Sequence, residues 1–243
     1  MHHDRVQLES FPTAEAMASA MAQRWVRLLA DRPNPPHRVA LSGGRIAAVF
    51  QREVARFATE LKVDWTGVEF FWGDERCVPP DHADSNFRVA NEALLIPCGI
   101  SSHHIHRLRG ELPPTEASEL GIHELRQSCP SNAEGWPVLD LVLLGMGEDG
   151  HVASLFPNTP TGTSHSRQWV VPVIGPKPPP QRLSLTFGVL ASAREVWVLA
   201  SGADKASALT ASLQSDGVTP LAQLIQMRSQ THIAGEIAIF ANR

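Results

Sequence analysis

The sequence predicts an α/β fold in which helices cover both faces of a mostly parallel sheet. Apolar runs of strand length alternate with segments of helical periodicity, which gives a β-α-β order along the chain. The strand-like runs lack the alternation of polar and apolar residues that marks a half-exposed sheet, so we expect both of their faces to be buried. The 243 residues can bury one substantial core, and we expect a single domain over residues 1–243.

Each predicted element is supported by a local pattern. Continuous apolar runs predict strands over residues 38–42, 68–72, 139–145 and 195–200. Apolar side chains at helical spacing predict helices over residues 13–31, 46–61, 85–95 and 115–127. Thr13, Ser85 and Thr115 stand at the start of three of these helices and are suited to act as N-caps. Residues 172–181 are rich in proline, and we expect a loop there between strand-like residues 169–171 and 182–187.

Composition and charge exclude several classes of protein. A formal net charge of −4 and a pI near 6.2 argue against broad nucleic-acid binding, which requires a basic surface. Cys77, Cys98 and Cys129 show no C-x-x-C spacing, so the sequence suggests neither a disulfide framework nor a zinc ribbon. The first residues lack the apolar run of a signal peptide, and no stretch approaches the roughly 18 apolar residues of a membrane span. We therefore expect a cytoplasmic protein that binds neither membranes nor nucleic acid.

Three unusual segments directly follow predicted strands. They are SGGR (42–45), GDER (73–76) and GMGEDGHVASLFP (145–157). In open parallel sheets, ligands bind beyond the carboxyl ends of the strands, where loops lead into helices. Because the three segments share that edge of the predicted sheet, we expect them to form one site.

The first segment and several lysines and arginines are suited to bind a phosphate. Two glycines follow a strand and precede a helix, so backbone N–H groups and the helix dipole can face an anion. The same glycines are also typical of a tight turn without a ligand, and the basic side chains of ordinary solvated charge. The predicted phosphate-binding residues are Ser42, Gly43, Gly44, Arg45, Lys177, Arg182 and Lys205.

His151 follows the glycine turn of the third segment, and we predict that it is the general base. An imidazole titrates near neutral pH and can therefore accept a proton from water. Asp149 or Asp74 would fix its tautomer, and Arg76 is suited to face a carbonyl or a developing oxyanion. Cys77 is a weaker candidate for a nucleophile, because the sequence shows no histidine placed to activate it. We expect water to be the nucleophile.

Two other motifs allow alternative interpretations. GMGEDG (145–150) matches the dinucleotide-binding pattern G-x-G-x-x-G. Against a dinucleotide, two carboxylates would face the pyrophosphate, Pro157 would end a helix early, and no acidic residue follows about 20 residues later. HHIH (103–106) resembles a metal site in composition, but strand alternation would point its histidines to different faces. We predict a structural role for these histidines, and neither a metal nor a cofactor for the protein.

Five segments, taken in order, resemble the 6-phosphogluconolactonase family. They are residues 41–44, 70–76 followed by 85–86, 139–157, 177–186 and 202–209. The block GMGEDGHVASLFP is the most specific, and the resemblance spans about residues 8–240. It implies a Rossmann-like three-layer α/β/α fold with a mostly parallel sheet, of the sugar-phosphate isomerase type. It also implies hydrolysis of 6-phospho-D-glucono-1,5-lactone to 6-phosphogluconate, a step of the oxidative pentose phosphate pathway.

The resemblance also assigns residues by position. The histidine of the GEDGH block is His151 and the arginine of the DER block is Arg76. The phosphate-side groups are Gly43, Gly44, Lys177 and Arg182. After the paired glycines the family often has Ser-Thr-Pro, whereas this chain has Arg45, Ile46 and Ala47, which changes the expected phosphate cradle. The expected partner is a small phosphorylated substrate, and the expected state is a monomer or a small homo-oligomer.

Two other functions are compatible with the same motifs. Glucosamine-6-phosphate deaminases are related, but their corresponding block has a glutamate after the histidine. Here no carboxylate lies between His151 and Pro157, so the ring-opening machinery of a deaminase is missing. A non-catalytic sensor would bind 6-phosphogluconate and leave lactone hydrolysis at its spontaneous rate. The intact block around His151 favours the hydrolase over both.

Overall fold

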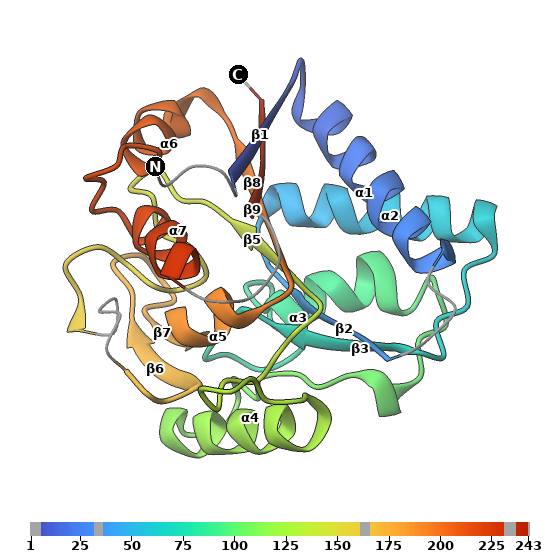
Figure 1. The fold of residues 1–243 in the computed structure, drawn as a ribbon. Coiled ribbons are helices and arrows are strands. Elements are labelled where there is room, and N and C mark those ends of the chain that lie inside the picture. Colours follow the sequence, from blue (N-terminus) through green and yellow to red (C-terminus); the bar gives the residue numbers. More distant parts are fainter. Residues whose placement is uncertain (1–5, 32–35, 161–165, 231–236, 243) are drawn as a thin grey trace.

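Six parallel strands form the main sheet (Figure 1). In sheet order they are β1 (Val6–Phe11), β9 (Ile237–Asn242), β8 (Glu195–Ser201), β5 (Leu141–Gly145), β2 (His37–Leu41) and β3 (Val68–Trp72). The structure is a computed structural model and describes residues 6–31, 36–160, 166–230 and 237–242. Four adjacent strands, β8, β5, β2 and β3, match the predicted ones. The sequence-based prediction omits β1 and β9, which form the other side of the sheet.

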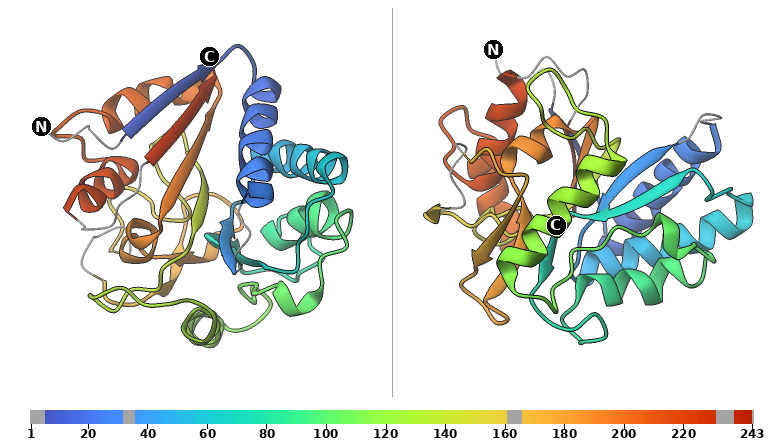
Figure 2. Two further views of the ribbon diagram at one scale, coloured as in Figure 1. Left: turned by 45° about the vertical axis from the view of Figure 1, so that its right-hand side comes forward. Right: turned by 90° about the horizontal axis from the view of Figure 1, so that it is seen from below.

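Helices cover both faces of this sheet, which confirms the predicted three-layer fold (Figure 2). α1 (Ala14–Asp31) and α2 (Arg45–Leu61) pack against each other on one face. α5 (Phe187–Ser192), α6 (Ala206–Ser212) and α7 (Pro220–Gln230) lie on the opposite face. The apolar residues that predicted α1 include Met17, Met21 and Trp25, and all three are fully buried. Within the described ranges, none of these helices combines the length and apolar character that a membrane crossing requires.

The predicted N-caps are confirmed at two of three helices. Thr13 Oγ1 accepts a hydrogen bond from the Ala16 N–H at 3.1 Å, at the start of α1. Ser85 Oγ accepts from the Arg88 N–H at 3.1 Å, where α3 (Asn86–Ala90) begins and then continues as a π-helical turn, η1 (Asn91–Leu95). The cap predicted at Thr115 is wrong, because α4 (Pro114–Ser128) starts one residue earlier with a proline, which suits the first helical turn.

A second, antiparallel sheet lies beside the main one. The strand-like residues predicted at 169–171 and 182–187 overlap two of its strands, but the sequence predicted neither the third strand nor the sheet. Its strands are β4 (Asp74–Arg76), β7 (Gln181–Leu185) and β6 (Val170–Ile174), in that order. The loop predicted over residues 172–181 is therefore wrong at both ends. Pro172 is tolerated because β6 is an edge strand, where no hydrogen-bond donor is required on the outer side. α4 packs on this sheet, and Ser118 Oγ donates to the Val170 carbonyl at 2.6 Å.

Candidate active site

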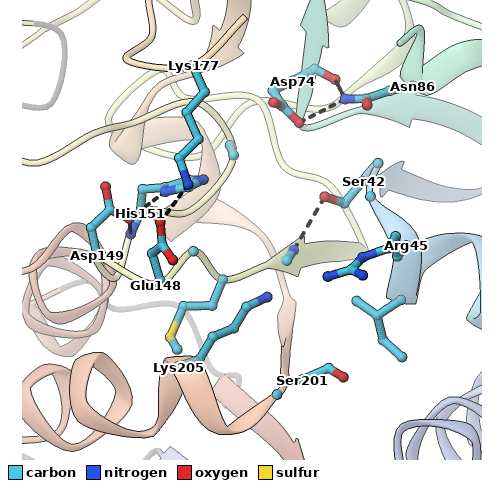
Figure 3. Close-up of a pocket in the computed structure, with 18 of the residues that line it drawn as sticks. Ser42, Arg45, Asp74, Asn86, Glu148, Asp149, His151, Lys177, Ser201 and Lys205 are labelled. Atoms are coloured by element: carbon cyan, nitrogen blue, oxygen red, sulfur yellow. Dashed lines mark hydrogen bonds and ion pairs between the residues drawn. The ribbon is translucent and has the colours of Figure 1, made fainter. Parts of the chain in front are cut away.

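The loops that follow β2, β5 and β8, together with β4 and the β6–β7 hairpin, line one cavity of about 660 Å³ (Figure 3). β2 and β5 are neighbours from which the chain continues toward opposite edges of the sheet, a position at which α/β proteins commonly bind ligands. Ser42 Oγ joins the two loops there, accepting a hydrogen bond from the Gly145 N–H at 3.3 Å. The structure brings all the predicted site residues to this cavity: Ser42, Gly43, Gly44, Arg45, Asp74, Arg76, Asp149, His151, Lys177, Arg182 and Lys205.

Asp149 holds the imidazole of His151 in place. His151 Nδ1 lies 2.5 Å from Asp149 Oδ1, and the same oxygen accepts from the His151 backbone N–H at 3.1 Å. Burial disfavours the charged form of Asp149, but the hydrogen bond and charge of His151 outweigh it, so the pKa of Asp149 lies below its ordinary value. Because the ionised carboxylate accepts from Nδ1–H, Nε2 is the nitrogen that is left to take a proton.

Two glycines permit this arrangement of the loop. A Cβ atom on Gly147 would lie 2.1 Å from His151 Nδ1, so only glycine lets the imidazole pack against the backbone here. Gly150 has φ +77°, a left-handed conformation that favours glycine. The described residues after this turn, 151–160, form no α-helix. The dinucleotide interpretation of GMGEDG therefore lacks the helix whose N-terminus would bind the pyrophosphate.

Asp74 lines the same cavity but binds other side chains. Its Oδ2 accepts from Ser154 Oγ at 2.6 Å, and its Oδ1 accepts from Asn86 Nδ2 at 3.1 Å. Of the two carboxylates predicted as partners of His151, Asp149 therefore makes the hydrogen bond and Asp74 does not.

Four basic side chains approach the cavity as two pairs of like charge. Arg76 and Arg182 are opposite each other in the β4–β7 ladder, and burial, together with the charge of Arg76, lowers the pKa of Arg182. Burial also lowers the pKa of Lys205 despite the nearby Asp204, and the charge of Arg45 adds to this shift. Like charges held together in a partly buried site are relieved when an anion binds between them.

The sequence matches a known protein family over most of its length. The profile of the family described as glucosamine-6-phosphate isomerases/6-phosphogluconolactonase matches residues 12–233. The chain belongs to this family. It is 33% identical over 215 residues to a 6-phosphogluconolactonase of Mycobacterium tuberculosis, covering 85% of each chain. It is 40% identical over 181 residues to that of Treponema pallidum, covering 73% of this chain and 72% of the other.

Solved structures agree with the family assignment. The 6-phosphogluconolactonase of Thermotoga maritima is 28% identical with a TM-score of 0.79, over 98% of this chain and 100% of the other. That of Trypanosoma brucei is 26% identical with a TM-score of 0.85, over 98% and 96%. A monomeric glucosamine-6-phosphate deaminase shares the fold, with a TM-score of 0.77 over 98% and 97%, at 16% identity. These structures confirm the predicted fold and the predicted resemblance.

Lys177, which the sequence predicts for the phosphate site, forms an ion pair in this member of the family. Its Nζ lies 2.5 Å from Glu148 Oε1, and both side chains are largely exposed (Figure 3). This hydrogen bond raises the pKa of Lys177. Lys177 lies at the tip of the β6–β7 hairpin, between β6 and β7.

Three further residues, of which Asn86 and Phe156 line the cavity and Ser154 lies buried beside it, were not assigned a role from the sequence. Asn86 binds Asp74, Ser154 binds the same carboxylate, and the ring of Phe156 lies 4.6 Å from the imidazole of His151 between centroids. Asn86 belongs to the family-like SN pair at 85–86, and Ser154 and Phe156 belong to the family-like block at 145–157. Asn86 and Ser154 bind Asp74 from 12 and 80 positions away, so these two contacts appear only in the fold.

Cys77, the weaker candidate for a nucleophile, is not suited to that role. It is half-buried, and burial together with the charge of Glu75 raises its pKa to about 11. A thiol with so high a pKa is almost entirely protonated at neutral pH and is a poor nucleophile.

The histidines of HHIH lie at the opposite end of β3 from the cavity. His104 Nδ1 is 3.0 Å and His106 Nε2 is 2.8 Å from the two carboxylate oxygens of Glu69, and His106 Nδ1 is 2.9 Å from Glu124. The expectation that these histidines face different sides is wrong for His104 and His106, which are two residues apart and share a side. In the ranges that the structure describes, no group of three or more side chains is suited to hold a metal ion.

Proposed function

We propose that this protein hydrolyses 6-phospho-D-glucono-1,5-lactone to 6-phosphogluconate. The observation that supports this most is the His151–Asp149 pair, which opens on the same cavity as the paired glycines and the clustered cations. Relatives named 6-phosphogluconolactonase, at 33% to 40% identity, support the choice of substrate.

In the proposed reaction, His151 Nε2 removes a proton from water as the water oxygen attacks the lactone carbonyl carbon. The resulting tetrahedral intermediate carries an oxyanion that faces Arg76. When the bond between the carbonyl carbon and the ring oxygen breaks, His151 returns its proton to that oxygen, and the ring opens to the acid. Asp149 stabilises the imidazolium that exists between these steps. General-base catalysis of this kind contributes about 10²–10⁴-fold, and an activated ester requires neither a covalent intermediate nor a metal.

The far end of the substrate carries the phosphate, which we assign to the paired-glycine turn and the cations around it. The N-terminus of α2 begins directly after Gly44, so its dipole and free N–H groups favour an anion. Arg45 and Lys205 lie on one side, and Arg182 and Lys177 approach from the second sheet. Lys177 exchanges its ion pair with Glu148 for the phosphate.

The test is to generate the lactone in situ and to follow acid release above the spontaneous rate. We expect His151→Ala to lower the catalysed rate about 10²–10⁴-fold. His123→Ala is the matched control, because His123 is exposed on α4 and does not line the cavity. Equal rates for wild type and His151→Ala would remove His151 from the mechanism.

Two further measurements separate the alternatives. Unphosphorylated gluconolactone should have a much lower kcat/KM, and a similar value for both lactones would contradict the phosphate site. Release of ammonia from glucosamine 6-phosphate would instead identify a deaminase, and binding of 6-phosphogluconate without faster lactone hydrolysis would identify a sensor.

A further inference from the structure

Glu75 is a buried carboxyl group beside the cavity that the proposed reaction does not use. It lies in β4 between Asp74 and Arg76, and since side chains alternate along a strand, it points away from the cavity that its neighbours line. Glu75 is only 2% exposed. Its two oxygens accept hydrogen bonds from the backbone N–H groups of Arg76, Asn86 and Phe87, each at 2.7 Å, and from Ser85 Oγ at 3.1 Å.

These hydrogen bonds fasten the start of α3 to β4. The first N–H groups of a helix have no partner within the helix, and Glu75 accepts from those of Asn86 and Phe87. Ser85, the N-cap of α3, donates its hydroxyl to Glu75 and accepts from the Arg88 N–H. The Glu75 carboxyl group therefore holds the backbone of Asn86 against β4.

Asn86 transmits this constraint to the cavity. It is 1% exposed, and its Nδ2 donates to the Asp74 backbone oxygen at 2.9 Å and to Asp74 Oδ1 at 3.1 Å (Figure 3). Because both Asp74 atoms are acceptors, the amide nitrogen must face Asp74, and the amide oxygen then faces Gly43. A Cβ atom on Gly43 would lie 1.8 Å from Asn86 Oδ1, so the amide packs directly on the glycine turn.

We propose that Glu75 is a positioning residue, which acts through Asn86 to hold the Asp74 carboxylate and the Gly43 turn in fixed relation to each other. Asp74 follows β3 and Gly43 follows β2, so the two groups come from different loops and Asn86 contacts both. This inference rests on the proposed function, in which Gly43 holds the phosphate. Displacement of a binding group by about 1 Å can cost on the order of 10²-fold in rate.

The first test compares Glu75→Gln, Asn86→Ala and the double variant in lactone hydrolysis. Glutamine replaces one acceptor oxygen with an NH₂ group, so it cannot accept all the hydrogen bonds that Glu75 accepts. We expect Glu75→Gln to lower kcat/KM by about 10- to 100-fold. Asn86→Ala should cause a similar loss, and the double variant should lose little more than either single variant. Glu69→Gln, a change at the other end of β3, is the control and should keep the wild-type kcat/KM.

Wild-type kcat/KM in Glu75→Gln, or losses that multiply independently in the double variant, would overturn the proposal. If Glu75→Gln does not fold, Asn86→Ala alone decides, since it leaves the Glu75 cap intact, and unchanged kinetics there would also overturn it. Titration with inorganic phosphate gives a readout that does not depend on the reaction. We expect weaker phosphate binding in both single variants. A wild-type protein that binds phosphate but does not hydrolyse the lactone would contradict the proposed function alone.

Discussion

Glu69 lies near the start of β3 and Glu75 lies in β4, and their two carboxyl groups are stabilised in different ways. Burial disfavours the charged form of both. At Glu69, hydrogen bonds and charge from His106 and His104 outweigh burial, and the pKa falls below its ordinary value. At Glu75, burial dominates over backbone N–H donors and raises the pKa to about 7. The carboxyl group far from the cavity has two histidine partners, whereas the one beside the cavity is held by backbone N–H groups and a hydroxyl.

The basic residues at the two ends of the sheet differ in the same way. At the end far from the cavity, Arg38 and Arg194 both pair with Asp140, at 3.7 and 3.2 Å. At the cavity, Arg45 and Lys205 form no ion pair with any carboxylate in the described part of the chain. In the described part of the chain, Arg38 and Arg194 thus have a carboxylate partner, whereas among the cations that line the cavity only Lys177 has one.

The largest expected difference between the two ends concerns their histidine–carboxylate pairs. Asp149→Asn should lower kcat about 10²–10⁴-fold, because an amide no longer holds His151 in the tautomer that accepts a proton at Nε2. Glu124→Gln, which alters the partner of His106, should leave kcat unchanged. Steady-state kinetics on the lactone measures both. If Asp149→Asn keeps wild-type kcat, the two histidine pairs have the same, purely structural role.

The next expected effect is a loss of stability at the end of the sheet far from the cavity. Glu69→Gln removes the carboxylate that His104 and His106 share, and hydrogen bonds between charged groups contribute about 1.5–3 kcal/mol. Since the Glu69 side chain is 21% exposed, we expect the lower part of that range, about 1.5–2 kcal/mol in the free energy of unfolding. Urea denaturation measures the change. A midpoint equal to that of the wild type would show that this network adds nothing to folding.

A smaller effect on KM is expected when a basic side chain is removed at the cavity, and none when one is removed at the other end of the sheet. Arg45→Ser should raise KM for the phosphorylated lactone about three- to tenfold, because one of several cations near the phosphate is lost. Arg194→Ser removes a cation that pairs with Asp140 far from the cavity and should leave KM unchanged. Inhibition by inorganic phosphate should weaken in parallel with the change in KM. An increase in KM of the same size in both variants would indicate long-range charge rather than a local contact.

The same contrast explains which strands the sequence predicts. β2, β3, β5 and β8 are buried on both faces, so they appear as continuous apolar runs whatever their partners are. β4 has only three residues, Asp74–Arg76, and all are charged, while β6 contains a proline. β4 is a strand because it pairs with β7, and that pairing joins residues about a hundred positions apart, as in Asp74 with Ser184.

The site follows a similar rule. His151 and the paired glycines are recognisable because a local turn and its chemistry lie within a few residues. The neighbours that orient the site are long-range: Ser154 is 80 residues from Asp74, and Gly145 is 103 residues from Ser42. The sequence also could not decide between Asp74 and Asp149 as the partner of His151, since both lie beside glycines at strand ends.

The last expected difference is in the pH dependence of stability at Glu69 and Glu75. The lowered pKa of Glu69 means that its stabilising contribution is present above the ordinary value of 4.5 and is lost as the pH falls through the folded value. The raised pKa of Glu75 gives the opposite sign: its ionisation costs stability, so its contribution is full below 4.5 and is lost as the pH rises toward about 7. We expect the difference in unfolding free energy between wild type and Glu69→Gln to shrink below 4.5. The difference between wild type and Glu75→Gln should shrink between 4.5 and 7. Urea denaturation over this pH range measures both differences, and equal slopes for the two variants would mean that the two carboxyl groups are stabilised alike.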